Sequence, residues 1–259
     1  MAVTIKSKKE IAILREGGKK LAVIRDELAA RAKAGVSAQE LEDLSAKLFE
    51  EAGGEASFLH YRGKKSEKPF PAAFCISVND AIVHGLPHRE VVFKEGDLVG
   101  IDVGLRYRGL FTDTAVTVPV GAVSKAGQKL LEVTKEALAV GIAAVRAGVT
   151  TGDIGCAIEH YVASAGSFGI VRTLAGHGVG YAVHEEPHIP NFGKRGEGVT
   201  LPAGAVIAIE PMLTLGGEKL VLDQDGFTFR TADGSLSAHF EHTLAVTRHG
   251  CEVLTEVKA

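Results

Sequence analysis

The sequence contains no tryptophan, three cysteines and no long uninterrupted apolar run. Cys75, Cys156 and Cys251 are odd in number and widely spaced, which argues against a disulfide framework and fits a reducing compartment. The N-terminal residues are charged from Lys6 onward and lack the apolar stretch of a signal peptide. No run reaches the roughly 18 apolar residues of a membrane span. We therefore expect a cytoplasmic protein without a membrane anchor.

An excess of either charge is also lacking. The formal net charge is −3, with 24% of residues charged. Such a balance gives no support for a nucleic-acid or anionic membrane partner held by bulk charge. The 259 residues are 46% hydrophobic, which is enough to build the core of one large domain.

Hydrophobic periodicity predicts a protein that contains both helices and strands. Apolar residues recur at helical spacing in residues 7–34, 37–53, 124–147 and 151–167. Strand-like runs occupy residues 74–78, 101–114, 206–209 and 239–247, and residues 64–71 and 176–180 are expected to be loops. Because the strands favour hairpins over βαβ units, we expect an α+β fold with a curved antiparallel sheet and helices on its outer face.

Residues 101–114 carry two aspartates in apolar strands. A turn centred between Tyr107 and Arg108 would place Asp102 directly opposite Asp113, with both side chains on one face. Two carboxylates so close repel, and one holds a proton unless a cation lies between them. The alternative is a hairpin with solvated aspartates, but the apolar arms favour burial and therefore a metal.

Three further clusters contain possible ligands. His177 lies between two glycines, which let the backbone approach a ligand closely. Glu210 ends an apolar strand before a proline, and Glu241 enters another strand. A glycine-rich anion loop at 176–180 and structural salt bridges for the two glutamates remain alternatives. Together with the aspartates, the set offers four carboxylates and one imidazole, which suits two adjacent divalent ions such as Mn, Fe or Co.

These residues lie in motifs that resemble the type I methionine aminopeptidases. The motifs are IDVG, TDTA, GHGVG, VHEEP, IEPM, FEHT and VHGLP, and the resemblance covers nearly the whole chain. It implies the pseudo-symmetric pita-bread fold and a single catalytic domain over residues 1–259. It also implies a metal-dependent hydrolase that removes the N-terminal methionine of nascent proteins when the second residue is small.

The resemblance implies a role for each site residue. The metal ligands are Asp102, Asp113, His177, Glu210 and Glu241, with Asp113 and Glu241 bridging two ions (Co, Mn or Fe, with Zn as a further option). The nucleophile is a water or hydroxide between the ions, with Glu210 handling its proton. His84 and His184 contact the scissile amide.

The resemblance also places Tyr61, Cys75 and Phe227 at the pocket for the methionine side chain. Phe227 stands where the family often has an indole, and Val183 where a larger aromatic is common. The loop at residues 64–73 is several residues longer than in familiar members.

Two alternatives share the resemblance. A proline-directed peptidase, such as a prolidase or aminopeptidase P, has the same five ligands but usually carries an extra N-terminal domain. A non-catalytic binding relative would have lost ligands, and here all five are present. We therefore expect a monomeric enzyme that acts on nascent N-termini at the ribosome, without a direct nucleic-acid motif.

Overall fold

The computed structural model describes residues 3–63 and 68–257. Its helices are α1 (Lys8–Arg31), α2 (Ala38–Ala52), α3 (Lys125–Ala144) and α4 (Thr151–Ala165). All four begin within one residue of the predicted start. Capping boxes are present at α1 and α2, where Ser7 and Ser37 exchange hydrogen bonds with Glu10 and Glu40. No helix in the described ranges is both long and apolar enough to cross a membrane.

The strands pair antiparallel throughout the part of the chain that the structure describes. They are β1 (Glu55–Ala56), β2 (Cys75–Val78), β3 (Ala81–Val83), β4 (Leu98–Tyr107), β5 (Leu110–Pro119), β6 (Gly169–Ile170), β7 (Gly176–Gly178), β8 (Glu185–Ile189), β9 (Val206–Ile209), β10 (Met212–Thr214), β11 (Leu220–Leu222), β12 (Phe229–Thr231), β13 (Ser237–His239), β14 (Glu241–Val246) and β15 (Cys251–Val253).

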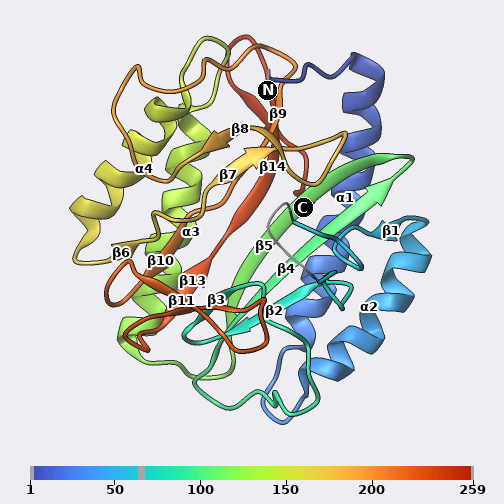
Figure 1. The fold of residues 1–259 in the computed structure, drawn as a ribbon, viewed down its shortest axis with the longest axis vertical. Coiled ribbons are helices and arrows are strands. Elements are labelled where there is room, and N and C mark those ends of the chain that lie inside the picture. The colour runs from blue at the N-terminus through green and yellow to red at the C-terminus, as the bar shows by residue number, and fades with distance from the viewer. Residues whose placement is uncertain (1–2, 64–67, 258–259) are drawn as a thin grey trace.

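The main sheet runs in the order β1-β4-β5-β14-β9-β7-β8, with β2 beside β4 and β15 beside β14. Helices α1 and α2 lie at one side of the strands and α3 and α4 at the other (Figure 1). Each helix pair covers its own core, one with Leu21, Leu28 and Val103 and one with Leu130 and Ile158. The predicted arrangement of an antiparallel sheet beneath outer helices is therefore present.

The central hairpin turns one residue later than predicted. Tyr107 pairs with Leu110, so Arg108 and Gly109 form the loop, and both have positive φ. This is the signature of a type I′ turn, whose twist matches that of the strands. Asp113 therefore lies opposite Gly104, and the predicted pairing with Asp102 is wrong.

Two other predictions need correction. The segment at 176–180, expected as a loop, forms strand β7 over Gly176–Gly178. The strand expected at 239–247 is interrupted at Phe240, which separates β13 from β14. Part of the loop at residues 64–73 (64–67) lies outside the described residues. Phe70 within that loop is buried, where an exposed residue was expected.

A glycine beside Asp102 makes room for a close packing contact. Gly100, Asp102 and Gly104 alternate along β4, so they share one face of the sheet. A Cβ on Gly104 would lie 2.1 Å from Ser57 Oγ and 2.7 Å from the Phe58 ring. Neither contact can be accommodated without a shift, because Ser57 and Phe58 pack directly over this strand.

We therefore predict that Gly104→Ala lowers the free energy of unfolding by about 1–3 kcal/mol, the usual cost of overpacking. The matched control is Gly100→Ala on the same face, where the nearest atom to the new Cβ lies at an ordinary 3.5 Å. Urea unfolding followed by circular dichroism compares the two. Equal losses in both variants would contradict the packing argument.

Candidate metal centre

Neighbouring strands bring the five predicted ligand residues together. Asp102 lies on β4, Asp113 on β5, His177 on β7 and Glu241 on β14, while Glu210 directly follows β9. Strands β4, β5, β14, β9 and β7 are successive neighbours in the sheet. Asp102 and Asp113 still share a face, because they are diagonal neighbours across the hairpin, offset by two residues. The sheet order therefore gathers residues that are far apart in the sequence.

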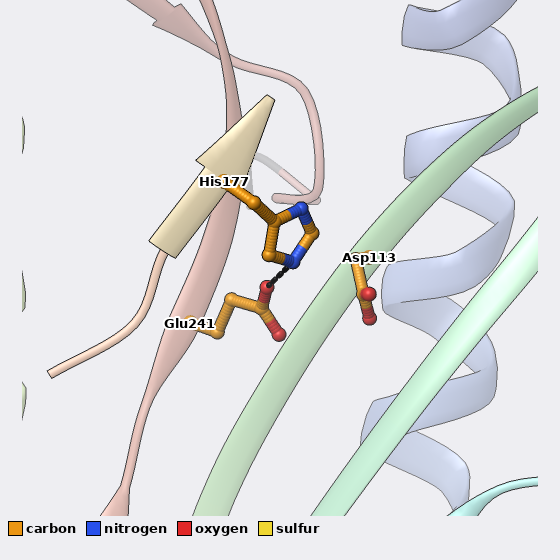
Figure 2. A group of neighbouring side chains, drawn as sticks. All are labelled: Asp113, His177 and Glu241. Atoms are coloured by element: carbon orange, nitrogen blue, oxygen red, sulfur yellow. Dashed lines mark ion pairs between the residues drawn. The ribbon is translucent and has the colours of Figure 1, made fainter. Parts of the chain in front are cut away.

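Asp113, His177 and Glu241 form the centre of this group. One ligand atom from each lies within 4.8 Å of those from the other two, and all three residues are buried. Figure 2 shows the side chains converging from three separate strands, with the line between His177 and Glu241 marking a 4.0 Å separation of Nε2 and Oε1. Such convergence in a buried place is typical of metal ligands rather than solvated surface charges.

Glu210 lies at the edge of the group. Its Oε1 is 3.6 Å from His177 Nε2, and its Oε2 is 3.5 Å from Nε2 of His239. The side chain retains 14% exposure, compared with 3% for Glu241. Glu210 therefore combines a place among the ligands with access for a proton from outside.

Three of the carboxyl groups, those of Asp102, Asp113 and Glu241, resist ionisation where they lie. Burial raises the pKa of Asp102 to about 7. Burial, with the charges of Asp102 and Glu210, also raises the pKa of Asp113. The pKa of Glu241 is raised by burial and by the charge of Asp113. Each carboxylate is costly because its neighbours are also negative and water is excluded.

The donor set fits divalent cations. Oδ1 of Asp102 and Oδ1 of Asp113 are buried without hydrogen-bond partners, so both oxygens are available to a ligand. Burial lowers the pKa of His177 to about 4, which keeps its imidazole neutral, as metal coordination requires. Four carboxylates and an imidazole suit hard to intermediate divalent ions. A bound cation would also remove the repulsion among the acids.

Two histidines border the ligand group. The ring of His184 lies 4.4 Å from that of His177, centroid to centroid, and its Nδ1 is 2.7 Å from the Tyr61 hydroxyl. His84 follows β3 with a positive φ of 58°. Burial first, and then the charge of His84, lower the pKa of His184 to about 4, so the two histidines are electrostatic neighbours. His84 in turn is an electrostatic neighbour of His239, so both histidines lie close to the ligand group.

An apolar cluster adjoins the ligands. The residues predicted for the pocket, Tyr61, Cys75 and Phe227, pack in it together. Its other members are Phe58, Phe70, Ala72, Leu86, Phe111 and Val183. Cys75 pairs with Asp102 across β2 and β4, which puts the cluster directly beside a ligand. The structure thus joins an apolar, aromatic surface to the polar group.

Sequence reasoning assigned no site role to three residues that either belong to the apolar cluster or contact a predicted ligand. Phe70 makes an edge-to-face contact with Phe227 at 5.5 Å. Phe58 lies in the same cluster, and His239 contacts Glu210. The segment around Phe70 is charged and contains prolines, which is typical of an exposed loop, so the sequence did not indicate that Phe70 is buried. For His239, its place two residues before Glu241 was a usable signal.

Comparisons with known proteins agree on one family. The model for metallopeptidase family M24 matches residues 12–248. A methionine aminopeptidase of Aquifex aeolicus is 46% identical over 99% of this chain and 100% of its own length. Methionine aminopeptidase 1 of Bacillus subtilis is 39% identical over 98% of this chain and its full length.

Solved structures extend the comparison. The crystal structure of a methionine aminopeptidase from Thermotoga maritima is similar with a TM-score of 0.93 and 41% identity, covering 99% of this chain and 100% of that one. A prolidase from Pyrococcus furiosus has a TM-score of 0.74 at 22% identity, over 98% of this chain and 66% of that one, and shows the fold alone. The predicted pita-bread fold is confirmed.

The raised pKa values predict an unusual stability effect. An acid whose pKa is raised by folding binds more protons folded than unfolded, so the contribution of these acids to the stability of the metal-free protein falls as pH rises above about 4. Asp113→Asn removes one such acid. We expect it to raise the free energy of unfolding in chelator at pH 8 by about 1–3 kcal/mol, and to abolish the stabilisation that added Mn²⁺ gives the native protein.

Urea unfolding at pH 8, with chelator and with Mn²⁺, measures both effects. Asp153→Asn is the matched control, because hydrogen bonds at the start of α4 lower the pKa of Asp153. That variant should lose stability in chelator and keep the response to Mn²⁺. A metal-free Asp113 variant less stable than the native protein at pH 8 would contradict the argument.

Proposed function

The chain belongs to metallopeptidase family M24, among its methionine aminopeptidases, and from this premise we propose how its residues perform the reaction. The protein is a metallo-exopeptidase that removes an N-terminal methionine. The convergence of Asp113, His177 and Glu241 beside an apolar, aromatic cluster is the observation that carries this function. A proline-directed activity is not favoured, because the likeness to prolidases shows the fold alone.

The five predicted ligands would hold two divalent ions. Asp113 and Glu241, both almost fully buried between the strands, would be shared by the ions. Asp102 would complete one site, and His177 with Glu210 the other. Mn, Fe and Co suit this oxygen-rich set best, with Zn as a further option. The ions, when bound, polarise the scissile carbonyl and make a water molecule acidic enough to act at neutral pH.

Glu210 would move the proton of that water. Among the four carboxylates it combines contact with His177 and partial exposure, and Nε2 of His239 lies 3.5 Å from its second oxygen. It would accept the proton as the water attacks and donate it to the leaving amine. One carboxylate would therefore accept the proton in the first half of the reaction and donate it in the second.

His184 and His84 would contact the scissile amide and stabilise the negative charge that develops as it is attacked. Burial lowers the pKa of each to about 4, so both imidazoles are neutral at pH 7 and each carries one N–H. In His184 the Tyr61 hydroxyl would donate to Nδ1, which leaves the proton on Nε2 to face the substrate. A donor fixed in a buried site stabilises developing negative charge more effectively than water does.

The apolar cluster would accept the methionine side chain. Tyr61, Cys75 and Phe227 border it, and Phe70 braces Phe227 edge-on. A flexible thioether makes favourable contacts with such ring edges. The cluster lies beside Asp102, so a methionine held there would bring its peptide bond to the ligand group.

The setting of the reaction follows from the resemblance. The substrates would be nascent chains at the ribosome whose second residue is small, and the protein would act as a cytoplasmic monomer. We propose residues 1–259 as a single catalytic domain, because both helix–sheet halves contribute ligands. The near-balanced charge fits a peptide substrate rather than nucleic acid.

Two tripeptides test the proposed specificity. The protein, loaded with Mn²⁺, Co²⁺ or Fe²⁺, is given Met-Ala-Ser or Ala-Pro-Ala, with a chelated sample as control. We expect metal-dependent release of methionine from Met-Ala-Ser and no cleavage of Ala-Pro-Ala. Cleavage of Ala-Pro-Ala alone would leave the metal ligands intact but overturn the methionine pocket, and methionine release in chelator would overturn the metal chemistry.

We predict that Phe227→Ala lowers kcat/KM for Met-Ala-Ser by about 10- to 100-fold, mainly through KM, because it removes binding surface rather than reacting groups. Metal content should be unchanged. The matched control is Phe168→Ala, a partly buried phenylalanine that packs in the other half of the molecule. Steady-state kinetics of both variants on Met-Ala-Ser test this prediction. Equal losses of kcat/KM in the two variants would show that general destabilisation is responsible.

A further inference from the structure

A buried lysine near the N-terminus contacts the loop that carries His184. The side chain of Lys6 has no exposed surface, and its Nζ donates to Glu185 Oε2 at 2.8 Å and to Thr4 Oγ1. Its aliphatic stem packs on Gly180, where an added Cβ would lie 2.4 Å from Lys6 Cε. The backbone N–H of Lys6 donates to Gly204 O, which anchors this segment beside β9. A fully buried ammonium is costly unless it is paired, so this arrangement is specific.

Glu185 links that lysine to the backbone of the loop. Its Oε1 accepts hydrogen bonds from the backbone N–H groups of Tyr181 and Ala182, while Oε2 accepts from Thr4 and Lys6. One carboxylate therefore closes the turn that ends at His184 and fastens it to residues 4–6. Burial alone would raise the pKa of Glu185, but these bonds and the lysine charge lower it, which favours the carboxylate form of Glu185.

Tyr181 adds a second connection between the same segments. Lys6 Nζ lies 5.0 Å from the centre of its ring, and its hydroxyl donates to Glu10 Oε1 at 2.9 Å. Glu10 also caps α1 through Ser7. Residues 180–185 are thus attached to the first turn of α1 as well as to residues 4–6.

We propose that Lys6 is a positioning residue for His184, acting through Glu185. The inference rests on the proposed role of His184 and deepens it. His184 lies in the loop that Glu185 closes, and its ring must keep contact with Tyr61 at 2.7 Å and stand beside His177. A misplacement of about 1 Å is enough to cost much of a reaction rate. The lysine touches neither metal ligands nor substrate, so its loss should alter turnover and not metal loading.

The first test compares two ion pairs that involve the N-terminal region. Lys6→Met removes the buried pair, and Arg15→Met removes the exposed pair between α1 and Glu252. We expect Lys6→Met to lower kcat on Met-Ala-Ser by about 10- to 100-fold, with metal content unchanged and KM within about threefold. Arg15→Met should stay within about twofold of the native kcat.

A double-mutant cycle shows whether Lys6 acts through His184. His184→Asn alone should lower kcat by about 100- to 1,000-fold. If Lys6 works by placing His184, adding Lys6→Met to that variant should cost less than about twofold more. A purely structural lysine would instead multiply the two losses, and that result would overturn the inference.

Other outcomes are also decisive. Native kcat in Lys6→Met, or lost metal in that variant, would overturn the inference while leaving the proposed function in place. Full activity in His184→Asn would overturn the role of His184 and with it this inference. Should Lys6→Met not fold, Lys6→Met/Glu185→Gln leaves no unpaired buried charge and still removes the ionic contact. Native kcat in this folded double variant would equally overturn the inference.

Discussion

Mutual repulsion among buried carboxylates is the constraint on which the rest of this structure depends. Burial and neighbouring charge raise the pKa values of Asp102, Asp113 and Glu241. Ionising any of them without a bound cation therefore costs free energy. Only a rigid sheet can hold them in place against that repulsion. The two helix-covered cores supply this rigidity, and the metal centre lies between the strands that they support.

Much of this arrangement was predictable from the sequence, for a physical reason. Strand side chains alternate with a period of two, so Asp102 and Asp113 share a face whether they are directly opposite or offset by two residues. The predicted turn was wrong because Arg108 adopts a positive φ that its residue type does not signal. The site survives that error, since a shift of two in the pairing leaves the face unchanged.

Contacts between distant segments were not predictable in the same way. Phe70 is separated from Phe227 by most of the chain, and Lys6 from Glu185 likewise, so no local pattern records either meeting. The charged segment around Phe70 even indicated exposure. Family resemblance supplied the ligands and the two histidines, whereas the packing that positions them became visible only in three dimensions.

The position of β14 has a consequence for biosynthesis. This strand lies between β5 and β9 in the sheet, although it follows both in the sequence. During synthesis, the edges of β5 and β9 that face each other therefore stay unpaired until β14 has been made. Glu241 arrives on that same strand, so a partly synthesised molecule has neither a closed sheet nor a full set of ligands. The full ligand set therefore cannot assemble before β14 has been synthesised.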